Sequence, residues 1–103
     1  MAHVVVLFNL LEGVDFSEYE RWALDRDVPT VRGLPSVESF RVLGATTLLG
    51  GGASPYSYIE IIEVTGIDDL VADVQSPEMK KIAGEFAAFA DNPTFIVTNE
   101  LGS

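Results

Sequence analysis

The order of strand-like and helix-like segments is the feature that most constrains this chain. β-Branched and aromatic residues predict strands over residues 3–10, 36–43, 56–64 and 94–101. Apolar residues at helical spacing predict helices over residues 14–27 and 66–90. The order β-α-β-β-α-β predicts a ferredoxin-like α+β fold with a four-stranded antiparallel sheet, as a single domain over residues 1–103.

Local signals set the expected helix ends. Asp15 followed by Glu18 has the spacing of a capping box and predicts the start of the first helix. Pro29 predicts that this helix stops just before it, because the residue preceding a proline avoids the helical region. Within the second helix, Ser76-Pro77-Glu78 resembles a renewed cap through which the helix continues.

Side-chain alternation predicts which face of the sheet meets the helices. In the first strand one face is wholly apolar and suits the helices: Val4, Val6, Phe8 and Leu10. The other face is apolar in the middle and polar at its ends: His3, Val5, Leu7 and Asn9.

In the third strand, Ile59 and Ile61 suit the helix side, which leaves Tyr58, Glu60 and Ile62 on the opposite face. That face is too apolar for free water. We therefore expect a second copy of the chain to cover it and a ligand pocket to lie between sheet and sheet or between sheet and loop.

Composition excludes several classes of function. The net charge is −10 with only six Lys and Arg residues, so the basic footprint of a nucleic-acid or anionic-membrane binder is missing. The absence of cysteine rules out disulfides, thiol catalysis and zinc–cysteine sites, and a lone histidine argues against any metal. A 48% hydrophobic content in 103 residues favours a homo-oligomer. The first apolar run lacks a basic start and is too short to span a bilayer, so we expect a cytoplasmic protein.

Two candidate proton-transfer groups lie on predicted strands. His3 is the only imidazole, and it is either a general base or an exposed residue at a strand end. Glu60 lies between apolar neighbours, where burial would raise the pKa of its carboxyl group. The alternative for Glu60 is a cross-strand ion pair with Arg41.

A third candidate closes the first predicted helix, in the stretch LDRDVPTVRGLP. Arg26 is favourable at a helix C-terminus, whereas Asp25 and Asp27 oppose the helix dipole. An acid placed there has either a chemical role, such as accepting a proton from a substrate, or an ion pair with Arg32.

Aromatic and polar side chains supply the candidate substrate contacts. Trp22, Tyr58, Phe40 and Phe95 could stack on an aromatic ligand, although Trp22 and Phe40 have the spacing of core residues. Tyr58 is the preferred pocket aromatic because it shares its parity with Glu60. Arg32, Arg41 and Asn9 complete the set of candidate substrate-binding residues.

The glycine-rich stretch over residues 44–55 is not a phosphate-binding loop. It lacks the GK[ST] ending, lies between two strands and has no basic residue beside it. We interpret it as a hairpin connection, with a mobile lid as the alternative.

Four stretches together resemble the RedY-like (HapK) family: VVLFNL, DVPTVRGLPSVESFRV, YIEIIEV and EFAAFADNPTFIVTNEL. This family belongs to the dimeric α/β barrel group, which also holds muconolactone isomerase-like proteins and small cofactor-free monooxygenases. RedY-like proteins are associated with bacterial gene clusters for prodiginines and bisindole alkaloids. Asp27, Arg32 and Pro35 lie in the matching motif, and Asp27 occupies a position where some relatives have histidine.

The resemblance implies a homodimer that needs no cofactor and acts in bacterial secondary metabolism. It implies a substrate that is a reactive pyrrole or indole intermediate made by an upstream oxidase. The first hypothesis is an enzyme in which Asp27, Glu60 or His3 moves a proton to direct coupling, rearrangement or tautomerisation. The alternatives are a carrier that shields the intermediate without a chemical step and a cofactor-free monooxygenase.

Overall fold

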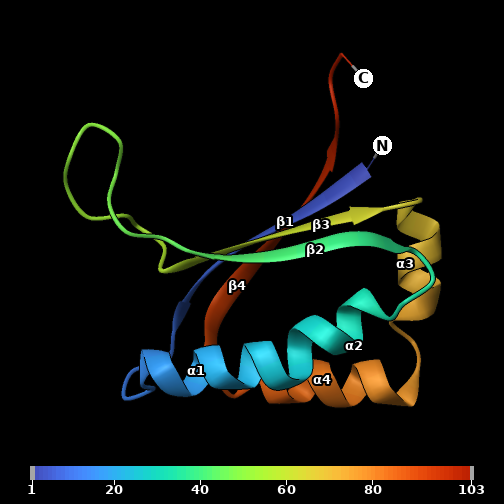
Figure 1. Ribbon diagram of the computed structural model, residues 1–103, viewed down its shortest axis with the longest axis horizontal. Coiled ribbons are helices and arrows are strands. Elements are labelled where there is room, and N and C mark those ends of the chain that lie inside the picture. Colours follow the sequence, from blue (N-terminus) through green and yellow to red (C-terminus); the bar gives the residue numbers. More distant parts are fainter. Residues whose placement is uncertain (1, 103) are drawn as a thin grey trace.

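The computed structural model describes residues 2–102 and contains one four-stranded sheet with all helices against one of its faces (Figure 1). The strands are β1 (Ala2–Leu10), β2 (Val37–Gly44), β3 (Tyr58–Val64) and β4 (Ala90–Asn99), and the α-helices are α1 (Phe16–Trp22), α2 (Val28–Arg32), α3 (Ile67–Asp73) and α4 (Pro77–Ala87). The strand order is β2-β3-β1-β4 and every pair is antiparallel. This arrangement confirms the predicted ferredoxin-like α+β fold.

The first helical region does not end before Pro29, as the sequence predicted. A π-helical segment, η1 (Ala23–Asp27), joins α1 to α2, and the Val28 amide bonds to the Ala23 carbonyl five residues back. Pro29 then lies in the first turn of α2, where its missing N–H costs little. The wider π turn therefore lets the chain remain helical through a proline.

The second helical region also differs from its prediction, because it consists of two helices. Ser76 ends the link after α3 and caps α4, its hydroxyl oxygen accepting a hydrogen bond from the Met79 amide at 3.2 Å. Helix α4 stops at Ala87 and β4 begins at Ala90, four residues before the predicted start. Ala90 pairs with Leu10 across the sheet, and this pairing between distant segments overrides the local turn signal.

The predicted face of β3 is wrong. In β1, Val6 pairs directly with Glu60 and Phe8 with Tyr58, and directly paired residues of antiparallel strands lie on the same face. Tyr58, Glu60 and Ile62 therefore face the helices, whereas Ile59 and Ile61 lie on the open face. Arg41 pairs with Ile61 and so lies on the opposite face from Glu60, which rules out the alternative of a cross-strand ion pair between Arg41 and Glu60.

The core lies between the sheet and the helices. Phe8 and Tyr19 are fully buried there, with their ring centroids 5.6 Å apart and nearly perpendicular. The other face of the sheet is covered by no described element and carries half-buried or exposed apolar side chains: Val5, Leu7, Leu43, Ile59, Ile61 and Ile96. We refer to these six residues as the open-face patch.

The connection between β2 and β3 projects beyond the sheet as a long loop (Figure 1). Within this loop, Thr47 and Ala53 form an isolated antiparallel β-bridge. The prediction of a hairpin connection is confirmed. No helix within residues 2–102 is long and apolar enough to cross a membrane.

Candidate functional site

A cavity of about 380 Å³ lies between the sheet and the helices. Its lining is mostly apolar, with three ionisable side chains, and comprises Val4, Asp27, Val31, Leu34, Phe40, Glu60, Ile62, Leu70, Val74, Met79, Lys80, Ile82, Ala83, Phe86 and Phe95. An apolar cavity with a few convergent polar groups is the usual form of a small-molecule site.

Asp27 is the last residue of η1, and its side chain lines this cavity. Only 5% of its surface is exposed, and burial raises the pKa of its carboxyl group from 3.8 to about 6. Arg32 does not pair with it, because the Arg32 guanidinium donates from Nε and Nη2 to the Phe40 carbonyl at 3.1 and 2.9 Å. The acid that the sequence placed at a helix end thus lies inside the protein.

Glu60 reaches the same cavity from the middle of β3. Its neighbours across the sheet are Val6 and Val42, it is 5% exposed, and its buried Oε2 has no hydrogen-bond partner. Burial, and then the nearby Asp27 carboxylate, raise the pKa of Glu60 from 4.5 to about 8. The structure therefore brings together two of the predicted candidates.

Tyr19 is a third polar group close to this pair, and it is not among the site residues predicted from the sequence. Its hydroxyl is buried without a partner, and burial, followed by Glu60 and Asp27, raises its pKa. Tyr19, Ala23 and Asp27 are all buried at four-residue spacing. That spacing, which places a phenol and an acid on one helical stripe, is the signal in the sequence that could have identified it.

Two of the predicted aromatic contacts lie in the cavity wall. Phe40 is buried, whereas Phe95 is 60% exposed and lies beside the exposed Lys80 and Ala83 at the opening. Phe86 packs edge-to-face against Phe95, with ring centroids 6.5 Å apart. The cavity thus offers aromatic rings from its interior to its mouth.

Tyr58 and Arg32 line a neighbouring hollow of about 260 Å³, which Tyr19 also lines. The Tyr58 hydroxyl donates to the Glu20 carboxylate at 2.7 Å. Tyr58 shares a face with Glu60, as its parity predicted, but it does not line the cavity that holds Glu60.

Three other predicted site residues lie away from the cavity. His3 is on the open face, its Nε2 being 3.1 Å from Glu63 Oε2. Arg41 shares that face. Asn9 anchors the long loop, since its amide donates to the Pro55 carbonyl and its Oδ1 accepts from the Ser57 amide and hydroxyl.

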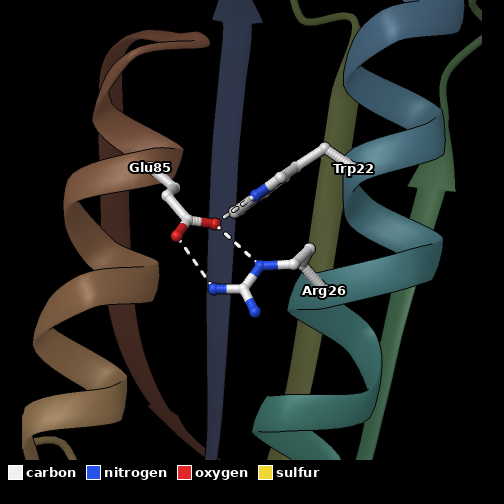
Figure 2. A network of polar contacts seen from close by, with 3 residues as sticks. All are labelled: Trp22, Arg26 and Glu85. Carbon is white, nitrogen blue, oxygen red and sulfur yellow. Dashed lines mark hydrogen bonds and ion pairs between the residues drawn. The ribbon is translucent and has the colours of Figure 1, made fainter.

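Trp22 contacts the helix layer rather than the cavity (Figure 2). Its indole N–H donates to Glu85 Oε1 at 2.8 Å. The Arg26 guanidinium binds the same carboxylate through two hydrogen bonds, at 3.0 and 2.8 Å. We refer to Trp22, Arg26 and Glu85 as the clamp, because they join α1 and η1 to α4.

The two cavity carboxyl groups have complementary protonation states near neutral pH. With a pKa of about 6, Asp27 is mostly ionised and can accept a proton, whereas Glu60, with a pKa of about 8, is mostly protonated and can donate one. Within residues 2–102 no group of three or more His, Cys, Asp or Glu side chains could hold a metal ion. The complementary protonation states of Asp27 and Glu60 in a mostly apolar cavity suit acid–base chemistry on an apolar ligand.

Comparisons with known proteins give the chain its family. The structure is similar to HapK from Hahella chejuensis, at 25% identity and a TM-score of 0.83, covering 100% of this chain and 95% of that one. It is similar in fold to SnoaB, a cofactor-independent oxygenase from Streptomyces nogalater, at 15% identity and a TM-score of 0.79 with 99% and 94% covered. A dimeric protein with a ferredoxin-like fold from Bacteroides fragilis matches at 13% identity and a TM-score of 0.72, with 96% and 95% covered. A search among curated proteins finds no match. The sequence model of the REDY-like protein HapK family matches residues 2–101, and the chain belongs to that family.

Proposed function

We propose that this protein is a cofactor-independent tailoring enzyme of bacterial secondary metabolism that moves a proton on a reactive indole or pyrrole intermediate. The observation that carries the proposal is the Asp27–Glu60 pair, two buried carboxyl groups in one apolar cavity. Burying ionisable groups without a partner is costly, and such costs are commonly found where the groups have a chemical role.

Tautomerisation of an imine to an enamine fits this pair. The Asp27 carboxylate removes a proton from the carbon next to the imine, and the C–H electron pair forms the carbon–carbon double bond. The protonated Glu60 gives its proton to the imine nitrogen, which takes up the electron pair of the C=N bond. The substrate is isomerised, and solvent returns each carboxyl group to its starting state.

The cavity supports such a step in two further ways. Its apolar walls exclude water from the reactive intermediate, and the rings of Phe40, Phe86 and Phe95 can stack on a planar heterocycle. A negative Asp27 also stabilises positive charge that develops on an iminium nitrogen. The indole or pyrrole class rests on the family resemblance.

We further propose that the functional unit is a homodimer. The open-face patch leaves six apolar side chains without cover, and packing the two sheets face to face would remove them from water. The similar protein from Bacteroides fragilis is described as dimeric, which supports a dimeric unit.

The test is to run an upstream indole oxidation with and without the protein and to compare the products by chromatography and mass spectrometry. Substoichiometric protein should yield a new isomer, and Asp27→Asn or Glu60→Gln should abolish it while binding of the intermediate persists. Asp25→Asn and Glu38→Gln are matched controls, since both acids are exposed.

Other outcomes would contradict the proposal in distinct ways. Products that are only preserved, in proportion to the protein added, would indicate a carrier. A product that contains oxygen and forms only in air would indicate a monooxygenase. No change with any indole or pyrrole intermediate would refute the substrate class.

A further inference from the structure

We infer that Glu85 is a positioning residue for Asp27: through the clamp it holds the π-helical turn so that the Asp27 side chain stays in the cavity. This inference rests on the proposed function only for its consequence for turnover.

The clamp is held by charge-assisted hydrogen bonds to one carboxylate. Glu85 accepts three hydrogen bonds, two of them from the Arg26 guanidinium in a bidentate arrangement (Figure 2). The bonds from Arg26 and Trp22 lower the pKa of Glu85 to about 2, so the carboxylate is charged under all ordinary conditions. Bidentate pairs between Arg and a carboxylate are among the more specific polar contacts. The clamp therefore defines the orientation of Arg26.

Arg26 and Asp27 are neighbours on one helical turn, so the direction of one side chain determines that of the other. Successive side chains point about 100° apart around the axis. When Arg26 is held against α4, the next residue is directed away from that contact, and in the structure Asp27 lines the cavity. The clamp thus fixes the rotation of the same turn that carries the acid.

The turn that carries Asp27 needs such a restraint. A π turn is rare and less regular than an α turn, and Asp27 is buried at its end, where its charged form is disfavoured. If this turn relaxed by one residue into an α-helix, Asp27 would rotate by about 100° and could reach water. The clamp opposes this relaxation, because Arg26 would have to leave Glu85.

Other groups around Asp27 cannot supply the restraint. Asp27 raises the pKa values of Tyr19 from α1 and Glu60 from β3, and Lys80 from α4 lies at the opening of the cavity. Burial is the cause of the raised pKa of Asp27. That pKa therefore reports whether the side chain stays inside.

The experiment measures the pKa of Asp27 by carbon-detected NMR of its carboxyl group in the full chain, without substrate. Glu85→Gln removes the negative charge and one of the two carboxylate oxygens that accept the clamp hydrogen bonds. Arg26→Lys keeps a positive charge but loses the bidentate contact. Glu78→Gln is the matched control, since it removes one negative charge from the same helix without touching the three clamp hydrogen bonds.

Glu85→Gln and Arg26→Lys should each lower the pKa of Asp27 by about 1 pH unit or more, towards its ordinary value, because the carboxylate becomes solvated. Glu78→Gln should leave it within about 0.2 pH units of the wild type, as expected for a screened surface charge. In turnover, both clamp variants should lose kcat more than they raise KM.

An unchanged pKa of Asp27 in both clamp variants, with only a lower melting temperature, would overturn the inference and leave the clamp as a stabilising contact. A lowered pKa in a protein that has no activity with any intermediate would support the inference while refuting the proposed function. If Glu85→Gln does not fold, Arg26→Lys decides the question.

Discussion

Replacing Glu60 by Gln should change how stability depends on pH, and this tests the central feature of the site. The carboxyl group has a pKa of 4.5 in the unfolded chain and about 8 in the folded protein. Below pH 4.5 it is protonated in both states and has no effect. Between these values the folded protein keeps a proton that the unfolded chain has lost, so the free energy of unfolding falls as pH rises.

The magnitude follows from the two pKa values. Each pH unit corresponds to about 1.36 kcal/mol, so raising the pKa from 4.5 to about 8 corresponds to about 5 kcal/mol of stability lost by pH 8. The pKa difference of Glu60 can be expressed as a free energy of unfolding because the side chain is only 5% exposed, so solvent screens it little. A domain of this size has a total stability of about 5–15 kcal/mol, so the effect should be large. Glu60→Gln cannot ionise and lacks this dependence.

Urea unfolding at pH 5.0, 6.5 and 8.0, at one protein concentration, gives the free energy of unfolding for both proteins. The stability of Glu60→Gln relative to the wild type should rise steadily with pH, by up to about 1.4 kcal/mol per unit. Glu38→Gln, an exposed control on β2, should run parallel to the wild type. A difference between Glu60→Gln and the wild type that is the same at all three pH values would refute the buried, protonated carboxyl group.

Further predictions concern turnover, Tyr19, the cavity mouth and the open face. The rate should follow a bell-shaped pH profile, rising near pH 6 as Asp27 ionises and falling near pH 8 as Glu60 loses its proton; a flat profile from pH 5 to 9 would contradict the acid–base pair. Tyr19→Phe should keep or raise the melting temperature by removing an unpartnered buried hydroxyl; a loss of more than about 1 kcal/mol in urea would argue against this. Phe95→Ala should raise KM at least several-fold with little effect on folding, since the ring is 60% exposed; an unchanged KM would remove it from the binding surface. Ile61→Lys should give a monomer by analytical ultracentrifugation, and a dimer that persists would move the interface elsewhere.

Local signals in the sequence were sufficient for the order of the elements. Helical spacing and strand composition are short-range properties, so they predicted both helical regions, all four strands and the hairpin connection. The same reasoning identified Asp27 and Glu60 as candidates. The charged form of an acid is unfavourable at a helix C-terminus, and it is unfavourable between apolar strand residues. That these two carboxyl groups share one cavity depends on contacts that no local pattern contains.

The π turn shows why part of the site could not be predicted. Proline at position 29 is normally a stop signal, and only the packing of the following turn against the sheet and α4 makes the continued helix favourable. The clamp joins Trp22 and Arg26 to a residue about 60 positions away, which no spacing rule reveals. The interpretation of Trp22 as a substrate contact therefore overlooked its partner in α4.

The face of β3 is the clearest division between sequence and tertiary structure. The segment YIEIIEV is apolar at both parities, so period-two alternation orients it equally well either way. Its register against β1 decides the matter, because pairing Glu60 with Val6 turns Glu60 towards the helices and Ile61 towards the open face. The sequence by itself determined that an acid lies mid-strand among apolar neighbours, and only the pairing of two distant strands placed that acid inside the protein.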